Sequence, residues 1–146
     1  MKVNIFISRD LTTASIFLQK LSAKDYNIHG ESLIAFTPIP FSTVPNVDWV
    51  FFYSKNAVQF FFQQWKKKHP TIQYAAIGKR TAQVLNQYVE NIDFIGNGQP
   101  EITAHDFLAI AKNQRVLFPR AKQSRKSVQL LLKNDIRVAD LVVYDN

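Results

Sequence analysis

Short runs of β-branched and aromatic residues alternate along this chain with segments whose apolar residues recur at helical spacing. The run Trp49–Tyr53 is apolar throughout, which is typical of a strand covered on both faces of a parallel sheet. Strands that alternate with helices predict an α/β fold with a doubly wound, five-stranded parallel sheet and helices on both of its faces. The predicted strands are Val3–Ile7, Ser32–Phe36, Trp49–Tyr53, Gln73–Ile77, Ile92–Ile95, Arg115–Phe118 and Ala139–Tyr144.

Helices are indicated by apolar faces and by residues that commonly cap a helix. Ser54, Thr81 and Ser124 each precede or open such a segment, as N-cap residues do. Thr103, with Asp106 three residues later, resembles a capping box. The predicted helices are about Leu11–Ala23, Asn56–Lys68, Thr81–Val89, a helix that begins at Thr103, and Ser124–Lys133.

One proline-rich segment interrupts this alternation. Thr37–Pro45 holds three prolines in nine residues, which favours extended chain and predicts a linker. The chain after it holds enough strands and helices for a complete unit, whereas two strands and one helix before it are too few to close a core. We therefore expect residues 1–37 to form an incomplete β-α-β portion of a first domain, 38–47 a linker, and 48–146 a complete α/β domain.

Composition narrows the class of protein. The 146 residues are 47% hydrophobic, so the chain can bury a core, and the absence of Cys excludes disulfides, thiolate nucleophiles and zinc–cysteine sites. The 18 Lys and Arg against 11 Asp and Glu give a formal charge of +7, which favours an anionic partner. The apolar run near the start is too short for a signal peptide, and no run is long enough to cross a bilayer. We expect a cytoplasmic protein with no membrane attachment.

Hydroxyl and basic residues follow several of the predicted strands. Ligands of open parallel sheets bind beyond the carboxyl ends of the strands, where helices present free N–H groups. Ordinary caps and solvated lysines explain any single one of these loops, but several on one edge favour an anion-binding rim. The loops are Ser8-Arg9, Ser54-Lys55-Asn56, Gly78-Lys79-Arg80-Thr81 and Pro119 through Lys126.

Other kinds of site find little support in the sequence. His29, His69 and His105 lie far apart without the spacing of metal ligands, so no metal site is predicted. There is no Ser-His-acid set, phosphate loop or dinucleotide fingerprint. The run Lys66-Lys67-Lys68 suits a helix carboxyl terminus; contact with a nucleic-acid backbone is the alternative, but no interleaved aromatic residues support it.

Five short segments form a recognisable series. They are Ile7-Ser8-Arg9, Tyr53-Ser54-Lys55-Asn56-Ala57-Val58, Ala75 through Ala82 with the pattern A-x-I-G-x-x-T-A, Leu117-Phe118-Pro119-Arg120 followed by Arg125, and Val142-Val143-Tyr144. Their order and spacing resemble those of the uroporphyrinogen-III synthase family, HemD-like proteins, and the resemblance spans the whole chain.

The resemblance implies two similar, flavodoxin-like α/β domains joined by a two-stranded linker. In that plan the chain begins in one domain, builds the other, and then returns to complete the first. This sequence resembles the plan as far as Tyr144, where the return begins. We therefore expect the second half of the first domain to be missing here, and the synthase activity of this chain to be impaired.

The resemblance also implies a reaction, a lyase-type cyclisation without metal or cofactor. Hydroxymethylbilane, a linear tetrapyrrole, loses its hydroxyl to give an azafulvene cation. Ring D attacks through its substituted carbon to form a spiro intermediate, and rearrangement closes uroporphyrinogen III with ring D inverted. The product is a polycarboxylate, so a basic cleft with free backbone N–H groups suits it.

The family's motifs assign expected roles to particular residues. Tyr144 would act as the proton donor for hydroxide departure, and packing at a strand end is its alternative role. Two other functions remain as hypotheses: a cofactor-free binding module for an anionic ligand or a protein, and nucleic-acid binding, which is less favoured. Exposed sheet edges further predict a homodimer that exchanges N-terminal segments. The expected substrate-binding residues are Arg9, Ser54, Asn56, Gly78, Lys79, Thr81, Arg120 and Arg125.

Overall fold

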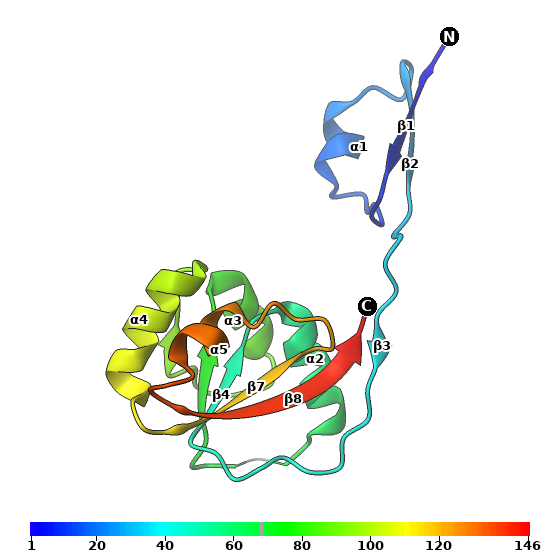
Figure 1. Cartoon of the computed structure of the whole chain (residues 1–146). Coiled ribbons are helices and arrows are strands. Elements are labelled where there is room, and N and C mark those ends of the chain that lie inside the picture. Colours follow the sequence, from blue (N-terminus) through cyan, green and yellow to red (C-terminus); the bar gives the residue numbers. More distant parts are fainter. Residues whose placement is uncertain (68) are drawn as a thin grey trace. The chain divides into compact units, whose positions relative to one another are not determined.

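The computed structural model describes residues 1–67 and 69–146 and divides into two compact units (Figure 1). Met1–Ala35 forms the first unit, and Phe36–Asn146 forms the second. The proline-rich segment therefore belongs with the second unit. Its start is itself a short strand, because Thr37 and Pro38 pair with the last strand of the chain.

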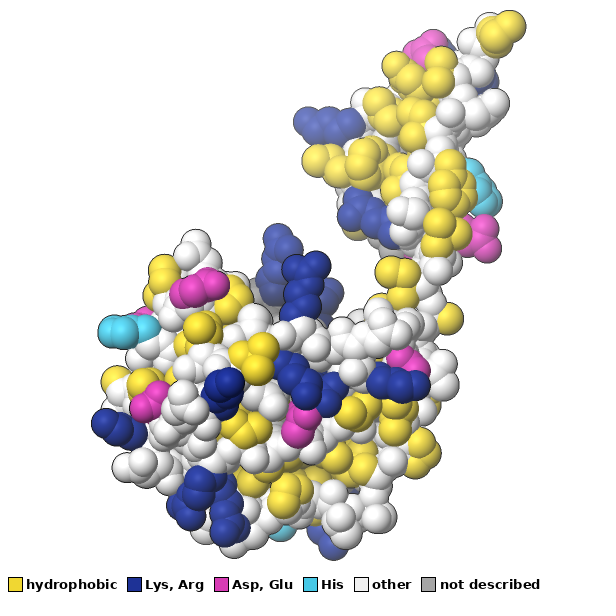
Figure 2. All heavy atoms as spheres, in the orientation of Figure 1, with side chains coloured by type: hydrophobic (Ala, Val, Ile, Leu, Met, Phe, Trp, Pro, Cys, Tyr) yellow, Lys and Arg dark blue, Asp and Glu magenta, His cyan; other side chains and the backbone are white. Residues whose placement is uncertain are grey.

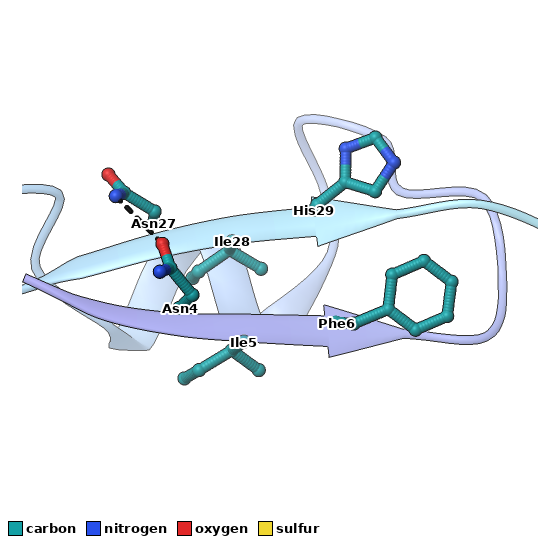
Figure 3. A pocket seen from close by; sticks show the side chains of 6 residues that line it. All are labelled: Asn4, Ile5, Phe6, Asn27, Ile28 and His29. Carbon is teal, nitrogen blue, oxygen red and sulfur yellow. Dashed lines mark hydrogen bonds between the residues drawn. The ribbon is translucent and has the colours of Figure 1, made fainter.

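The first unit is a two-stranded parallel sheet with one short helix. Its elements are β1 (Val3–Ile7), α1 (Ile16–Lys20) and β2 (Tyr26–Gly30). Figure 3 shows side chains of both strands, among which Phe6 stacks beside His29 and Asn27 donates a hydrogen bond to Asn4. Phe6 is 55% exposed, and no residue of this unit is buried. The unit therefore has no closed core of its own.

Two predicted elements of the first unit are wrong. Residues 32–36 do not form a strand, because the Ser32 side chain hydrogen-bonds the backbone carbonyl and N–H of Ile34 and so turns the chain. The strand forms earlier, at Tyr26–Gly30. The helix expected over Leu11–Ala23 is only α1, because Ser15 and Ser22 hydrogen-bond nearby backbone N–H groups at its two ends.

The second unit is a doubly wound sheet with helices on both faces, which confirms the predicted fold class. The strand order is β3-β8-β7-β4-β5-β6, in which β4 to β8 run parallel and β3 pairs antiparallel with β8. The strands are β3 (Thr37–Pro38), β4 (Trp49–Phe52), β5 (Gln73–Ala76), β6 (Phe94–Ile95), β7 (Arg115–Ala121) and β8 (Arg137–Asp145). The helices are α2 (Lys55–Gln64), α3 (Lys79–Leu85), α4 (Pro100–Ala111) and α5 (Ser127–Leu132).

Numbered along the chain, the five parallel strands follow the order 3-2-1-4-5. This order matches the first five strands of the 3-2-1-4-5-6 sheet of dinucleotide-binding folds, and it differs from the 2-1-3-4-5 order of flavodoxin. The order reverses between β4 and β7. In such sheets the crevice beyond the carboxyl ends of the strands at that point is where ligands bind.

Consecutive residues of β4 supply two separate hydrophobic cores. Phe52 faces α2 and α3, and its ring centre lies 5.5 Å from that of Phe61. Phe51 faces α4 and α5, and its ring centre lies 5.0 Å from that of Phe107. All four residues of Trp49–Phe52 are buried, as the unbroken apolar run predicts. Each such buried side chain contributes about 1.5–3 kcal/mol to folding. The strand that ends at the candidate site is thereby held rigidly from both sides.

The expected helix caps are correct at one position and wrong at three. Ser54 caps α2, as predicted, whereas Gly78 precedes α3 in place of Thr81 and Lys126 precedes α5 in place of Ser124. Thr103 lies inside α4, because Pro100 takes the first helical position, where its missing N–H costs nothing. The helix expected to run to Lys68 ends earlier, at Gln64, and Lys68 itself lies outside the described residues.

Within the described residues, no helix has the length and apolar character that a membrane span requires.

Candidate functional site

The candidate residues of the second unit lie at the carboxyl edge of its sheet. Ser54 follows β4, Gly78 follows β5, and Arg120 and Tyr144 lie near the ends of β7 and β8. Because these strands are parallel, their carboxyl ends meet at one edge. Figure 2 shows more Lys and Arg side chains than Asp and Glu side chains on the visible face of this unit.

The hydroxyl of Tyr144 lies beside the helix-capping Ser54. Their oxygens are 3.4 Å apart, and the Ser54 Oγ also accepts a hydrogen bond of 3.1 Å from the N–H of Ala57. Tyr144 is 7% exposed, and its ring stacks on Phe60 at 5.0 Å and meets the edge of Phe36 at 5.8 Å. Packing therefore fixes the ring while its hydroxyl is hydrogen-bonded at the start of α2.

The start of α2 presents unused backbone donors. Within the described part of the chain, the N–H groups of Lys55 and Asn56 have no hydrogen-bond acceptor, because no helical carbonyl precedes them by one turn and Ser54 accepts only from Ala57 and Val58. Lys55 is exposed and Asn56 is half-buried. The positive end of the helix dipole adds to the charge of Lys55 here, which favours a carboxylate.

The turn after β5 is narrow and places Lys79 outside and Thr81 inside. Gly78 is buried, and a side chain at this position would lie 3.1 Å from the Cα of Gly98 in the turn after β6. Thr81 is 5% exposed, and its N–H donates to the Gly78 carbonyl at 3.1 Å. Lys79 is exposed. A ligand at this turn would therefore meet Lys79 and the backbone more readily than the Thr81 hydroxyl.

Arg120 is a buried residue of an ion-pair network. Its guanidinium is bound by Asp140 in two contacts of 2.6 Å, and its Nη1 donates to the carbonyls of Ala121 and Lys122 at 2.8 and 3.0 Å. The Lys126 ammonium lies 3.2 Å from the same carboxylate. With its side chain 9% exposed, Arg120 holds the loop after β7.

The acid and the bases of this network each stabilise the charged form of the other. Burial alone would raise the pKa of Asp140, but hydrogen bonds from Arg120 and Lys126, together with their charges, lower it below its usual range. The hydrogen bond with Asp140 raises the pKa of Arg120, against the opposing effect of burial. Both groups are therefore charged at neutral pH.

Arg125 differs from Arg120 in that it is exposed and makes no ion pair with any described residue. Its neighbours in the loop are engaged: Lys122 lies 3.1 Å from Asp145, and Lys126 contacts Asp140. Of the two arginines expected to bind substrate in this unit, Arg125 is the one whose guanidinium is available to an anion.

Three residues near this edge did not stand out in the sequence. The Tyr53 hydroxyl accepts the N–H of Gln129 at 2.9 Å, and burial raises its pKa, so the phenol stays protonated. The Oε1 of Gln129 is buried without a hydrogen-bond partner among the described residues. Asp140 is a lone acid inside a predicted parallel strand, and that position was the available signal, since such a residue requires a cationic partner.

Arg9 belongs to the first unit. Its N–H donates to the Ile7 carbonyl at 2.7 Å just beyond β1, and its guanidinium lies 5.3 Å from the centre of the Phe17 ring. It therefore also follows the carboxyl end of a strand, but in its own unit.

Neither unit offers a metal centre among residues 1–67 and 69–146: no three His, Asp or Glu side chains gather closely enough to hold an ion. The candidate site consists instead of hydroxyl groups, backbone N–H groups and cations.

The family model described as uroporphyrinogen-III synthase HemD matches residues 17–146. Among solved structures, the chain is similar to uroporphyrinogen-III synthetase from Helicobacter pylori 26695, with 22% identity and a TM-score of 0.65, covering 100% of this chain and 62% of that one. It is also similar to a mutant uroporphyrinogen III synthase from Thermus thermophilus, with 14% identity and a TM-score of 0.65, over 98% of this chain and 62% of that one.

A second Thermus thermophilus structure matches with 14% identity and a TM-score of 0.54, over 99% of this chain and 63% of that one. No curated protein matches the sequence. The chain thus spans a little over three-fifths of the length of the solved proteins it resembles. Since the family model covers nearly the whole sequence, and the fold is that of the same family's solved members, this chain belongs to the uroporphyrinogen-III synthase family.

Proposed function

We propose that this chain binds hydroxymethylbilane at the carboxyl edge of its larger unit and takes part in the cyclisation to uroporphyrinogen III in heme biosynthesis. Membership of the family supports the substrate and the reaction. The observation that carries the assignment to this edge is the pair formed by the Tyr144 and Ser54 hydroxyls, 3.4 Å apart, at the start of α2.

Substrate binding would rest on backbone donors and exposed cations. Carboxylates of the bilane would accept from the free N–H groups of Lys55 and Asn56, and would be attracted by Lys79 and Arg125. Arg120 would act indirectly, because its guanidinium is already bound to Asp140 and to two carbonyls of the loop that carries Arg125. These contacts together would hold the flexible bilane in a folded shape, which brings its two ends near each other.

Tyr144 would supply the proton for the first chemical step. The bilane's carbon–oxygen bond breaks as the phenol proton passes to the departing hydroxyl, which leaves as water. Ring D then attacks the resulting cation. The macrocycle loses one proton after closure and rearrangement, and that proton restores the phenol, so the cycle balances with one water lost. Ser54, which can accept from or donate to the phenol, would orient it throughout.

A cyclisation assay with hydroxymethylbilane tests this proposal. Type III product above the spontaneous type I closure would support it, and Tyr144→Phe and Arg125→Gln should lower the type III rate. Lys112→Gln, an exposed lysine beyond α4, is the matched control and should leave the rate unchanged. Saturable, salt-sensitive binding without closure would instead favour a binding module. The absence of both binding and closure would overturn the proposal.

A further inference from the structure

A pocket lies at the amino edge of the sheet of the second unit, away from the proposed substrate site. It has a volume of about 600 Å³. Its walls come from the carboxyl end of α2, the segment that leads into β5, and the segment between α3 and β6. These segments precede the parallel strands, whereas Ser54 and Gly78 follow them, so the two sites occupy opposite edges. The volume falls within the range of about 300–1,000 Å³ that small-molecule sites have.

Two pairs of parallel rings form much of the lining. Phe62 and Tyr88 stack with centres 4.9 Å apart and planes 6° from parallel, and Trp65 stacks on His69 at 5.2 Å and 10°. Tyr74, which lines the same pocket, lies 6.1 Å from Phe62. Flat ring faces beside an open space favour a flat, apolar ligand body. Tyr88 is 39% exposed, so this aromatic cluster is not sealed within the core.

The charged lining of the pocket holds two acids, Glu90 and Asp93, and two exposed lysines, Lys66 and Lys67, whose ammonium groups could bind an anion. Lys66 and Lys67 make no ion pair within the described residues, and the Lys67 ammonium lies 5.8 Å from the Trp65 ring centre. The carboxylate of Asp93 already accepts the N–H of Tyr74 at 2.9 Å. The Nε2 of His69 is buried and has no hydrogen-bond partner among the described residues, a state that a bound ligand would relieve.

We propose that this pocket is a second binding site, separate from the tetrapyrrole site, for a planar aromatic molecule that carries a carboxylate. The ring system would lie against Tyr88 and Trp65, and the carboxylate would be bound by Lys66 or Lys67. The imidazole of His69 would hydrogen-bond the ligand. Nothing in this site depends on the residues at the carboxyl edge.

Trp65 provides a built-in reporter for the test. The chain has two tryptophans, and the other, Trp49, is 2% exposed in the core on the far side of the sheet. We would titrate the whole chain with naphthalene-2-carboxylate and follow the two indole N–H signals by NMR. The expected result is a saturable shift of the Trp65 signal with a Kd below about 1 mM, and no shift of the Trp49 signal.

Variants test separately whether the lysines bind the carboxylate and whether the aromatic side chains bind the ring system. Lys66→Gln with Lys67→Gln should weaken naphthalene-2-carboxylate about fivefold but leave the neutral 2-naphthylmethanol unchanged, the effect of losing about 1 kcal/mol of charge attraction. Lys133→Gln is the matched control and should change neither. Tyr88→Ala should weaken the binding of both ligands.

Tyr144→Phe, which alters the proposed substrate site, should leave the binding of both ligands unchanged. Failure of this proposal can therefore be distinguished from failure of the proposed function. A Trp65 signal that does not saturate, or equal binding by the Tyr88 variant, would overturn the proposal.

Discussion

Arg120 and Asp140 form a two-contact ion pair across adjacent parallel strands, with Nε to Oδ1 and Nη2 to Oδ2 both at 2.6 Å. In the β7–β8 register, Asp140 pairs with Phe118 and Arg120 with Val142, so the two residues lie two positions apart along the sheet and their side chains share a face. The guanidinium then reaches the carbonyls of Ala121 and Lys122. One arginine thereby joins the two strands to the loop that presents Arg125.

Replacing Arg120 should therefore affect the stability of the fold more directly than it affects substrate binding. In Arg120→Ala, Asp140 loses its main partner and two carbonyls lose their donor, so we expect the free energy of unfolding to fall by about 2–3 kcal/mol, less than for a fully buried pair because Asp140 is 30% exposed. Urea unfolding measures this change. Arg120→Lys keeps the charge without the planar fork and should recover only part of the loss. Wild-type stability in Arg120→Ala would contradict the structural role.

The same pair should make stability depend on acid pH. The pKa of Asp140 is lowered in the folded state from the ordinary 3.8, so folding favours its charged form. The resulting stabilisation is present above the unfolded pKa and is lost as the pH falls through the folded pKa. Urea unfolding from pH 7 down to pH 2 should show this loss begin below about pH 5 in the wild type. Asp140→Asn should be less stable at pH 7 and should lack this component of the acid dependence.

Substitutions of Ser54 should separate its capping role from its place in the site. Ser54→Ala removes the acceptor for the Ala57 N–H and should lower stability by about 1 kcal/mol. Ser54→Asp keeps a good cap, and so should keep stability, but sets a negative charge beside the free N–H groups of α2. Tetrapyrrole binding, measured by titration with a polycarboxylate analogue, should therefore be weakened in Ser54→Asp more than in Ser54→Ala. The reverse order would exclude this edge as the anion site.

Secondary structure could be predicted where the residues of a segment share one strong preference. It could not be predicted where a side-chain hydrogen bond or a distant partner determines the backbone conformation. The buried strand Trp49–Phe52 could be predicted because the run Trp49–Tyr53 is apolar throughout. Ser32–Phe36 was also predicted as a strand, but hydrogen bonds from the Ser32 side chain turn the chain there. Thr103 matched a capping box, yet Pro100 starts the helix earlier.

The candidate site divides in the same way. Ser54 and Gly78 follow strands directly, so their position at one edge could be predicted from the order of elements alone. The pairing of Arg120 with Asp140 could not, since it depends on the register of β7 with β8. The sequence predicted substrate binding by both Arg120 and Arg125, but in the structure Arg120 is buried and only Arg125 of the two is exposed.

The first unit leads to a prediction about association. It exposes Phe6, Leu33 and Ile34 at 55%, 70% and 55%, and none of its residues is buried, so burying this apolar surface against a second chain should be favourable. We expect the purified chain to form a dimer by exchange of its N-terminal segments, with a mass by light scattering that rises with concentration. Phe6→Ser should shift this equilibrium toward the monomer, whereas Lys2→Gln, also exposed and near β1, should not. A strict monomer at high concentration would exclude the exchanged dimer.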